Sequence, residues 1–309
     1  MSAVAYVNGR ICSQQDATIS VFDHGFLYGE GVYEVIRTYD GGLFLVGRHF
    51  RRLRASASMI TLDVGMTDSV LEGVVLETIA AYRAGAGEAA EGQEILARIL
   101  VTRGIGEMSY DPSKSPHPSL VVIVKPLVPP PASAYERGVA VALVSVVRNH
   151  PASVDPRIKS NNLLNNVLAM QEALRRGPFF EAILRNFRGE LAECSQSNLF
   201  LIKDGTARTP ALEAGLLAGI TREFVEEVAL EAGIPMVDSV LRDDDLFGAD
   251  EVFLTSTSKE IVPIVRVDDR VIGSGRPGSI TLRLLDAYRL KARAVAESGG
   301  RPGITLTAS

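Results

Sequence analysis

The segment Pro126–Ala134 contains four prolines, and this proline-rich run constrains the fold of the 309-residue chain more than any other feature. Proline lacks a backbone N–H and restricts the residue before it, so such a run disfavours helix interiors and central strands. Strand-like and helix-like patterns lie on both sides of the run. We therefore expect two domains, residues 1–126 and 135–309, joined by a linker at 127–134.

Both predicted domains mix strands with helices. In the first half, an alternating strand over 3–8 is followed by helical patterns over 48–60 and 67–83. The second half has more strand patterns and ends in a helical pattern over 277–297. The predicted fold class is α/β (an α+β arrangement of two domains), with a small N-terminal domain and a larger, strand-rich C-terminal domain.

Composition excludes several classes of function. Apolar residues make up 46% of the chain and charged residues 22%, which is typical of a globular protein. The net charge of −5 argues against a nucleic-acid partner, and no apolar run is long enough to span a membrane. Two cysteines and four scattered histidines match no disulfide framework and no metal-ligand spacing. We expect a cytoplasmic protein without a metal, a nucleic-acid partner or a membrane partner.

The segment 157–166, with the sequence RIKSNNLLNN, combines a lysine with four asparagines ahead of a helical apolar pattern. Asparagine and serine favour helix starts, and Leu163 to Leu174 has the spacing of a buried helical face. Lys159 would then be held on a short approach to a core helix. A constrained lysine is a candidate for covalent chemistry, although by itself the pattern also fits a surface lysine before a helix. The chain has only six lysines, which leaves few rivals.

Two further patterns fit an anion site with a neighbouring carboxylate. Gly219 and Thr221 stand at a predicted helix start, where free N–H groups and the helix dipole attract anions. A hydroxyl-rich run, Thr255–Ser258, follows a predicted strand, and Glu193 follows another. Each has an ordinary structural explanation as a cap or a solvated acid. Together, a lysine, a carboxylate and a phosphate cradle are what pyridoxal 5′-phosphate requires.

The same residues fall in motifs that occur in one known family. From about residue 3 to about residue 290, the chain resembles the fold-type IV (class-IV) aminotransferases. The matching blocks, in order, are His24-Gly25 through Tyr33-Glu34, Arg52-Leu53 through Ala57, Arg157-Ile158-Lys159-Ser160 with Asn165, Glu193 through Ser197-Asn198-Leu199-Phe200, Leu217 through Gly219-Ile220-Thr221-Arg222, and Thr255 through Glu260-Ile261.

The resemblance implies a cofactor, pyridoxal 5′-phosphate, held between two domains of a homodimer or higher homo-oligomer. By matching position, Lys159 would form the Schiff base with the cofactor and take the substrate's α-proton. Glu193 would pair with the pyridine nitrogen. The other implied cofactor-binding residues are Arg52, Ser197, Asn198, Leu217, Gly219, Ile220, Thr221, Ser256 and Thr257.

For substrates, the resemblance implies an amino acid and a 2-oxo acid. The interpretation we favour is transamination between a branched-chain L-amino acid and 2-oxoglutarate. Two alternatives stay open: a D-amino-acid aminotransferase, which the pattern Tyr33-Glu34-Val35 resembles, and an aminodeoxychorismate lyase. A non-enzymatic interaction protein on the same scaffold is the remaining alternative, against which Lys159 and Glu193 speak. The predicted substrate residues are Tyr28, Tyr33, Val35, Arg98, Met108, Tyr110 and Leu164.

Overall fold

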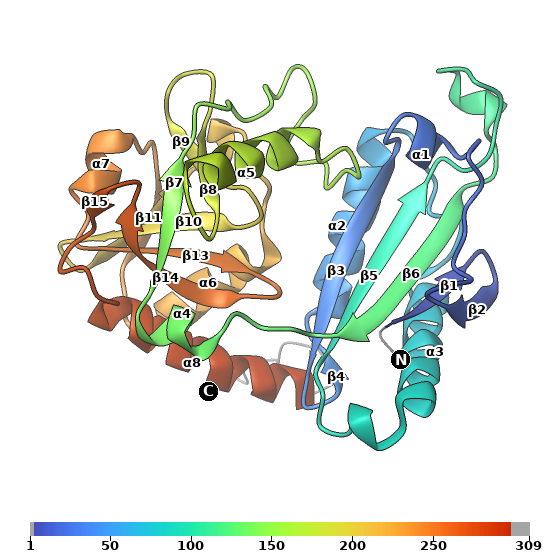
Figure 1. Ribbon diagram of the computed structural model, residues 1–309, viewed down its shortest axis with the longest axis horizontal. Coiled ribbons are helices and arrows are strands. Elements are labelled where there is room, and N and C mark those ends of the chain that lie inside the picture. The colour runs from blue at the N-terminus through green and yellow to red at the C-terminus, as the bar shows by residue number, and fades with distance from the viewer. Residues whose placement is uncertain (1–2, 298–309) are drawn as a thin grey trace, which may run out of the picture. The chain divides into compact units, whose positions relative to one another are not determined.

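The computed structural model describes residues 3–297, which form two compact units (Figure 1). Unit 1 comprises the chain up to Val128, Ile158–Asn162 and the residues from Ala292; unit 2 comprises Pro129–Arg157 and Leu163–Lys291. The chain first passes from one unit to the other at Val128, within the proline-rich segment. Residues 298–309, which end the predicted C-terminal domain, lie outside the described residues.

Unit 1 is built on a six-stranded sheet in the order β2-β1-β6-β5-β3-β4, with antiparallel pairing throughout. Its helices α2 and α3 pack against the sheet and share its apolar core. The elements are β1 (Val4–Val7), β2 (Arg10–Ser13), α1 (His24–Leu27), β3 (Gly31–Tyr39), β4 (Gly42–Leu43), α2 (Val46–Met59), α3 (Asp68–Ala86), β5 (Ile95–Thr102) and β6 (Ser119–Pro126), with 3-10 turns at Gly87–Ala90 and Pro112–Lys114.

Alternation along β3 and β5 gives this sheet two different faces. Val32, Ile36 and their neighbours on β5 are buried against the helices, as expected for strands with one covered face. Tyr33 and Val35 point to the other face and are half-buried. Val35 lies opposite Arg98 in the ladder, so these predicted substrate residues share one face.

Unit 2 is built on a mixed, strongly buried set of strands in the order β12-β11-β10-β13-β14-β7-β8-β9, with β15 on β14. β9 also lies against β10. In the turn between these two strands, the Cys194 N–H donates to the Ser197 C=O at 2.8 Å. The strands are β7 (Val139–Leu143), β8 (Ala182–Arg185), β9 (Leu191–Cys194), β10 (Asn198–Lys203), β11 (Thr206–Pro210), β12 (Met236–Ser239), β13 (Glu251–Ser256), β14 (Glu260–Val267) and β15 (Arg270–Val271).

The helices of unit 2 pack around these strands. α6 lies against β12 and β13, and the Phe224 ring meets Tyr288 of α8 edge to face. Within residues 3–297, no helix is long and apolar enough to cross a membrane. The helices are α4 (Ala132–Glu136), α5 (Leu164–Arg176), α6 (Ile220–Glu231), α7 (Asp243–Phe247) and α8 (Ser279–Glu297), whose last residues are counted with unit 1, and a 3-10 turn covers Leu212–Ala214.

The prediction that Leu163 to Leu174 forms a buried helical face is wrong. α5 does form there, but its buried residues are Ala169 and Ala173, which pack on β7 and β8. Leu164, Val167, Leu168 and Leu174 are exposed in the single chain. Small residues let the helix approach the sheet closely, so the bulky apolar side chains are turned outward.

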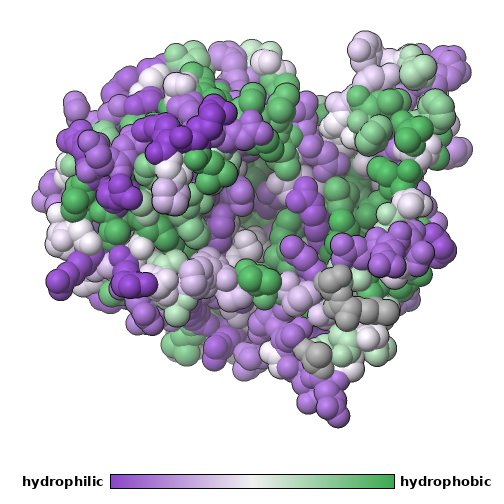
Figure 2. All heavy atoms as spheres, in the orientation of Figure 1, coloured by the Kyte–Doolittle hydropathy of each residue, from purple (hydrophilic) through white to green (hydrophobic). Residues whose placement is uncertain are grey.

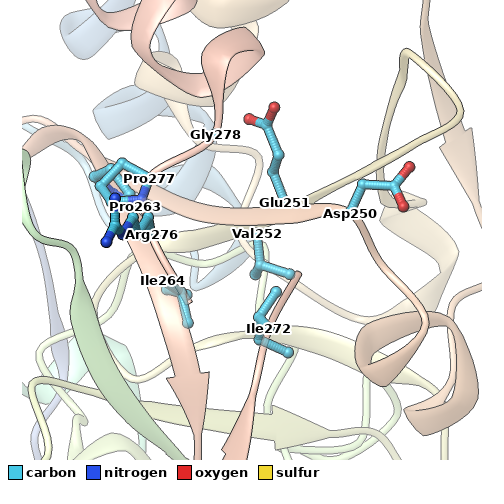
Figure 3. A pocket seen from close by; sticks show the side chains of 9 residues that line it. All are labelled: Asp250, Glu251, Val252, Pro263, Ile264, Ile272, Arg276, Pro277 and Gly278. Atoms are coloured by element: carbon cyan, nitrogen blue, oxygen red, sulfur yellow. The ribbon is translucent and has the colours of Figure 1, made fainter. Parts of the chain in front are cut away.

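Figure 3 shows a recess of unit 2 beside the start of α8. Its Glu251 carboxylate accepts the Ile280 N–H at 3.1 Å and the Thr281 N–H at 2.8 Å, and so caps the helix. A Cβ at Gly278 would collide with Glu251, which explains the glycine there. Glu251, which lines this recess, therefore caps α8. None of the residues around the recess is a predicted site residue.

Candidate functional site

Lys159 is held by its backbone in unit 1. Its C=O accepts the Tyr33 N–H at 2.9 Å, and the Asn161 N–H donates to the Gly31 C=O at 2.9 Å, so residues 159–161 lie along the edge of β3. The Lys159 N–H donates to Ser56 Oγ of α2 at 3.1 Å. A Cβ at Gly31 would come within 2.6 Å of the Asn161 side chain, so only glycine allows this approach. The Lys159 side chain therefore extends from a backbone that is held in place.

Two cations lie over the ring of Tyr33 in unit 1. The Lys159 amine is 4.6 Å from the ring centroid, and the Arg98 guanidinium is 4.1 Å from it. Such cation–π contacts orient long, flexible side chains. The structure thus brings together three predicted residues: the candidate covalent lysine, an aromatic side chain and the arginine assigned to a carboxylate.

On the helix-covered face of the same strand lies a buried polar triad of Glu34, Arg52 and His49. Glu34 is fully buried and accepts Arg52 Nε at 2.7 Å and the same arginine's Nη2 at 2.9 Å. His49 Nδ1 donates to Glu34 Oε2 at 2.7 Å, while the His49 Nε2 atom is buried without a hydrogen-bond partner among residues 3–297. Glu34 therefore fixes the arginine that we predict to bind phosphate.

The charges of the triad follow from burial and pairing. Burial alone would raise the pKa of Glu34, but the charges of Arg52 and His49 and their hydrogen bonds bring this pKa well below its usual range. Burial lowers the pKa of His49; Glu34 opposes that effect, and the cations of Arg52 and Lys159 add to it. Glu34 is thus ionised and His49 neutral near pH 7.

In unit 2, Glu193 is buried at the end of β9 with both carboxylate oxygens engaged. Arg148 Nε donates to Oε1 at 2.6 Å, and the Leu217 N–H donates to Oε2 at 3.1 Å. Arg148 is itself held by Asn165 Oδ1 at 3.1 Å. A buried carboxylate that is hydrogen-bonded at both oxygens keeps a fixed direction.

The start of α6 has the features of an anion site. Gly219 is its N-cap and supplies no side-chain cap, so the first N–H groups of the helix, at Ile220 and Thr221, lack an internal partner. Asn198 Nδ2 donates to the Leu217 C=O at 3.0 Å, and its Oδ1 occupies the space that a Cβ of residue 219 would need. The local structure thus requires glycine at the cap.

Hydroxyl groups lie beside this helix start. Asn198 pairs directly with Thr255 between β10 and β13. Thr255 Oγ1 and Ser256 Oγ are both buried and have no hydrogen-bond partner among the described residues. Buried hydroxyls are rarely left unpaired, so they fit a ligand rich in acceptor oxygens, such as phosphate. Thr257, also predicted, follows them half-buried.

Ser197 has a different environment from its neighbours. Its hydroxyl donates to the buried Glu181 carboxylate at 2.6 Å, so its proton already has an acceptor. The predicted role of Ser197 in cofactor binding would have to use its backbone or its oxygen lone pairs.

Of the remaining predicted substrate residues, Met108, Tyr110 and Leu164 are exposed in the single chain, and Tyr28 is half-buried. Tyr110 and Met108 are 89% and 74% exposed, and Leu164 is 63% exposed. The Tyr110 ring packs on Tyr28, with centroids 5.2 Å apart. The loop that carries Tyr110 is held by His24, whose Nε2 lies 2.8 Å from the Glu107 C=O. In the single chain, these exposed side chains are surface residues rather than the lining of a pocket.

Sequence reasoning missed three residues of this arrangement: His49, Arg148 and, as a site residue, Glu34. Each is charged or titratable and buried, but burial cannot be read from a local pattern of single residues. The one available signal was Glu34 between Tyr33 and Val35, since a charge in an otherwise apolar strand needs a buried partner.

Comparison with known proteins agrees with this geometry. Residues 31–267 match the family model of class IV aminotransferases. The chain belongs to the class IV aminotransferase family. The fold class and the resemblance predicted from the motifs are thereby confirmed, and the protein is an aminotransferase by family.

This chain is similar in sequence to aminotransferases of two kinds. A provisionally named branched-chain-amino-acid aminotransferase of Methanocaldococcus jannaschii is 38% identical over 284 residues, which cover 92% of this chain and 94% of that protein. A D-alanine aminotransferase of Staphylococcus haemolyticus is 34% identical over 291 residues, covering 92% and 95%.

Solved structures of the family are also similar. The branched-chain amino acid aminotransferase of Escherichia coli has a TM-score of 0.88 at 28% identity, covering 99% of this chain and 98% of that one. The branched-chain amino acid aminotransferase of T.th., solved with pyridoxamine 5′-phosphate, has a TM-score of 0.86 at 28% identity, covering 98% and 96%.

The buried triad of Glu34, Arg52 and His49 leads to a prediction about the stability of the protein. Glu34→Gln leaves Arg52 and His49 without their anion, and should lower the free energy of unfolding by about 3–5 kcal/mol. The pKa of Glu34 is lowered on folding, so its ionisation stabilises the fold above about pH 4.5, its ordinary pKa, and less as the pH falls below that value. The difference between wild type and variant, measured by denaturant titration, should shrink in acid.

The matched control is Asp68→Asn, which breaks the exposed Arg54–Asp68 pair of the same unit. It should cost about 1 kcal/mol or less at any pH. Equal losses in the two variants would contradict the assignment of Glu34 as a buried anchor.

Proposed function

We propose that this chain is a pyridoxal 5′-phosphate-dependent transaminase that moves an amino group between a branched-chain L-amino acid and 2-oxoglutarate. The observation that carries the proposal is Lys159, whose backbone is fixed by β3 and α2 and whose amine lies over Tyr33. Family membership supplies the reaction class.

The donor groups fit the proposed cofactor. In unit 2, the start of α6 and the unpaired hydroxyls of Thr255 and Ser256 suit its phosphate, and Glu193 suits a protonated ring nitrogen. In unit 1, Arg52 would add a cation for the phosphate. When bound, pyridoxal phosphate supplies an aldehyde that takes up amino groups and a ring that accommodates negative charge.

The protein's own residues would then divide the work. Lys159 Nζ is the group that accepts the substrate's α-proton and returns it, since its backbone is fixed while its side chain can move. Arg148 holds the Glu193 carboxylate in one orientation. Glu34 keeps Arg52 oriented. The other buried candidate, Lys259, has its amine paired with Glu181 at 2.6 Å and is therefore not a free nucleophile.

The half-buried face of the unit 1 sheet favours a branched aliphatic substrate. Tyr33 and Val35 offer apolar surface, and Arg98 offers a guanidinium for a carboxylate. Relatives with a branched-chain name occur both among the similar sequences and among the similar structures. The D-alanine aminotransferase relatives, at similar identity, favour the second candidate, a D-amino-acid aminotransferase.

We also propose a homodimer. Unit 1 exposes apolar side chains around α1 and the loop that follows β5, and unit 2 exposes those of α5, as Figure 2 shows over both regions. Exposed apolar patches of this kind mark interaction surfaces. A second copy is the occupant we propose, since Met108, Tyr110 and Leu164 would otherwise stay in water.

The cofactor assignment can be tested by borohydride reduction and peptide mapping. With pyridoxal phosphate present, reduction should attach the cofactor to Lys159, and Lys159→Ala should lose both this label and transamination by several orders of magnitude. Glu193→Gln is the informative companion: it should keep the label but lose most turnover. Labelling of Lys259 instead would overturn the assignment.

The substrate assignment can be tested with a panel of L- and D-amino acids and 2-oxoglutarate. L-leucine, L-isoleucine or L-valine should exceed D-alanine in kcat/KM, because the substrate face is mainly apolar. A D-alanine rate about tenfold above that of L-leucine, or about 1.4 kcal/mol in barrier, would favour the second candidate.

The dimer can be tested by sedimentation of Phe26→Asp. Phe26 lies in α1 and is 65% exposed, so a charge there should weaken association and release monomer. Leu76→Asp on α3, 48% exposed, is the control and should leave the assembly unchanged. A wild type that sediments as a monomer would refute the dimer.

A further inference from the structure

Glu181, directly before β8, organises the loop between β9 and β10. Its carboxylate accepts the Gln196 N–H at 2.8 Å, Ser197 Oγ at 2.6 Å and Ser195 Oγ at 3.2 Å. All three residues of the loop therefore donate to one buried side chain. This loop connects Glu193 to Asn198, two residues of the candidate site in unit 2.

Lys259 brings the neighbouring turn to the same carboxylate. Its amine lies 2.6 Å from Glu181 Oε1 and 3.3 Å from Gln196 Oε1. Lys259 belongs to the turn between β13 and β14, which follows Ser256, and the buried Ser256 hydroxyl has no hydrogen-bond partner among the described residues. Its N–H donates to the Ser256 C=O at 3.1 Å. The ion pair thus joins this turn to the loop behind Glu193.

The turn is held in an unfavourable backbone conformation. Glu260, next to Lys259, has a φ of +60°, which a residue with a side chain rarely adopts. Surrounding contacts hold it: Tyr135 OH donates to the Lys259 C=O at 3.1 Å, and Arg289 Nε donates to Glu260 Oε2 at 2.7 Å. A strained turn persists only where its neighbours determine it, and Lys259 is one of these attachments.

We propose that the Lys259–Glu181 ion pair is a positioning device, which holds the loop 195–197 and the turn 256–259 together and sets how tightly unit 2 retains the phosphate of its cofactor. The identity of that cofactor rests on the proposed function. Lys259 acts through Glu181, not on the reacting atoms. The Lys259 side chain is 15% exposed and that of Glu181 is 1% exposed, so loss of the cation would leave a buried, unpaired carboxylate.

The other titratable groups around the pair do not replace the Lys259 cation. Burial raises the pKa of the Cys194 thiol well above its usual range, so this neighbour stays neutral. Arg289 is already paired with Glu260. Removal of the Lys259 charge therefore leaves the Glu181 carboxylate without its ion-pair partner. The titratable and charged residues near the pair are Glu181, Lys259, Cys194, Glu193, Tyr135, Glu260 and Arg289.

The test is the rate at which pyridoxal phosphate leaves Lys259→Met, followed by its absorbance after dilution into a scavenger. Release should be about tenfold faster than in wild type, because the buried Glu181 carboxylate loses its cation and no longer holds the loop 195–197 and the turn 256–259 together. Lys259→Arg should restore retention. Lys259→Met combined with Glu181→Gln should recover most of it, because no buried charge is left without a partner.

The matched control is Lys203→Met, which breaks the Lys203–Asp250 pair of the same unit, with side chains 43% and 50% exposed. It should release the cofactor as wild type does. In the cofactor-free protein, amide hydrogen exchange at Gln196 should accelerate in Lys259→Met but not in Lys203→Met.

The outcomes separate this inference from the proposed function. Wild-type retention in Lys259→Met, or a double variant that releases the cofactor as fast as the single one, would overturn the positioning role. Should Lys259→Met fail to fold, the arginine and double variants decide in the same way. A wild type that takes up no pyridoxal phosphate would refute the proposed function, while the exchange measurement would still test the pair.

Discussion

The two-sided character of β3 is the constraint on which the rest of unit 1 depends. Because successive side chains of a strand point to opposite faces, Tyr33 and Val35 share a face with Arg98, while Glu34 points into the helix-covered core. The strand's edge binds the backbone of Lys159. One segment therefore positions Lys159, the sheet face that we propose for the substrate and the arginine that we propose for the phosphate, and a register shift of one residue would invert all three.

Buried carboxylates with dedicated cations recur through the molecule. Glu34 pairs with Arg52, Glu193 with Arg148, and Glu181 with Lys259. A buried charge is costly unless its partner is well placed, so these pairs contribute little net stability compared with apolar side chains. Each pair instead holds a side chain or a loop in the one orientation that the proposed chemistry needs.

The exposed apolar side chains show what a periodic pattern leaves undecided. α5 buries alanines and exposes leucines, contrary to the expectation from its periodicity. Periodicity reports that one side of a helix is apolar, but not whether that side faces the chain's own core or another molecule. Met108 and Tyr110, two predicted substrate residues of the loop after β5, are likewise exposed in the single chain.

The sequence by itself determined the alternation of β3, the glycines that permit close backbone approach, the helix start at Gly219 and, through its ordered motifs, the family. These features depend on local backbone chemistry, so neighbouring residues specify them. Only the tertiary structure revealed the partners of Glu34, Glu193 and Glu181, because each pair joins residues between 15 and 78 positions apart. Burial and ion pairing over such separations arise from the packing of elements, which no local pattern of residue types encodes.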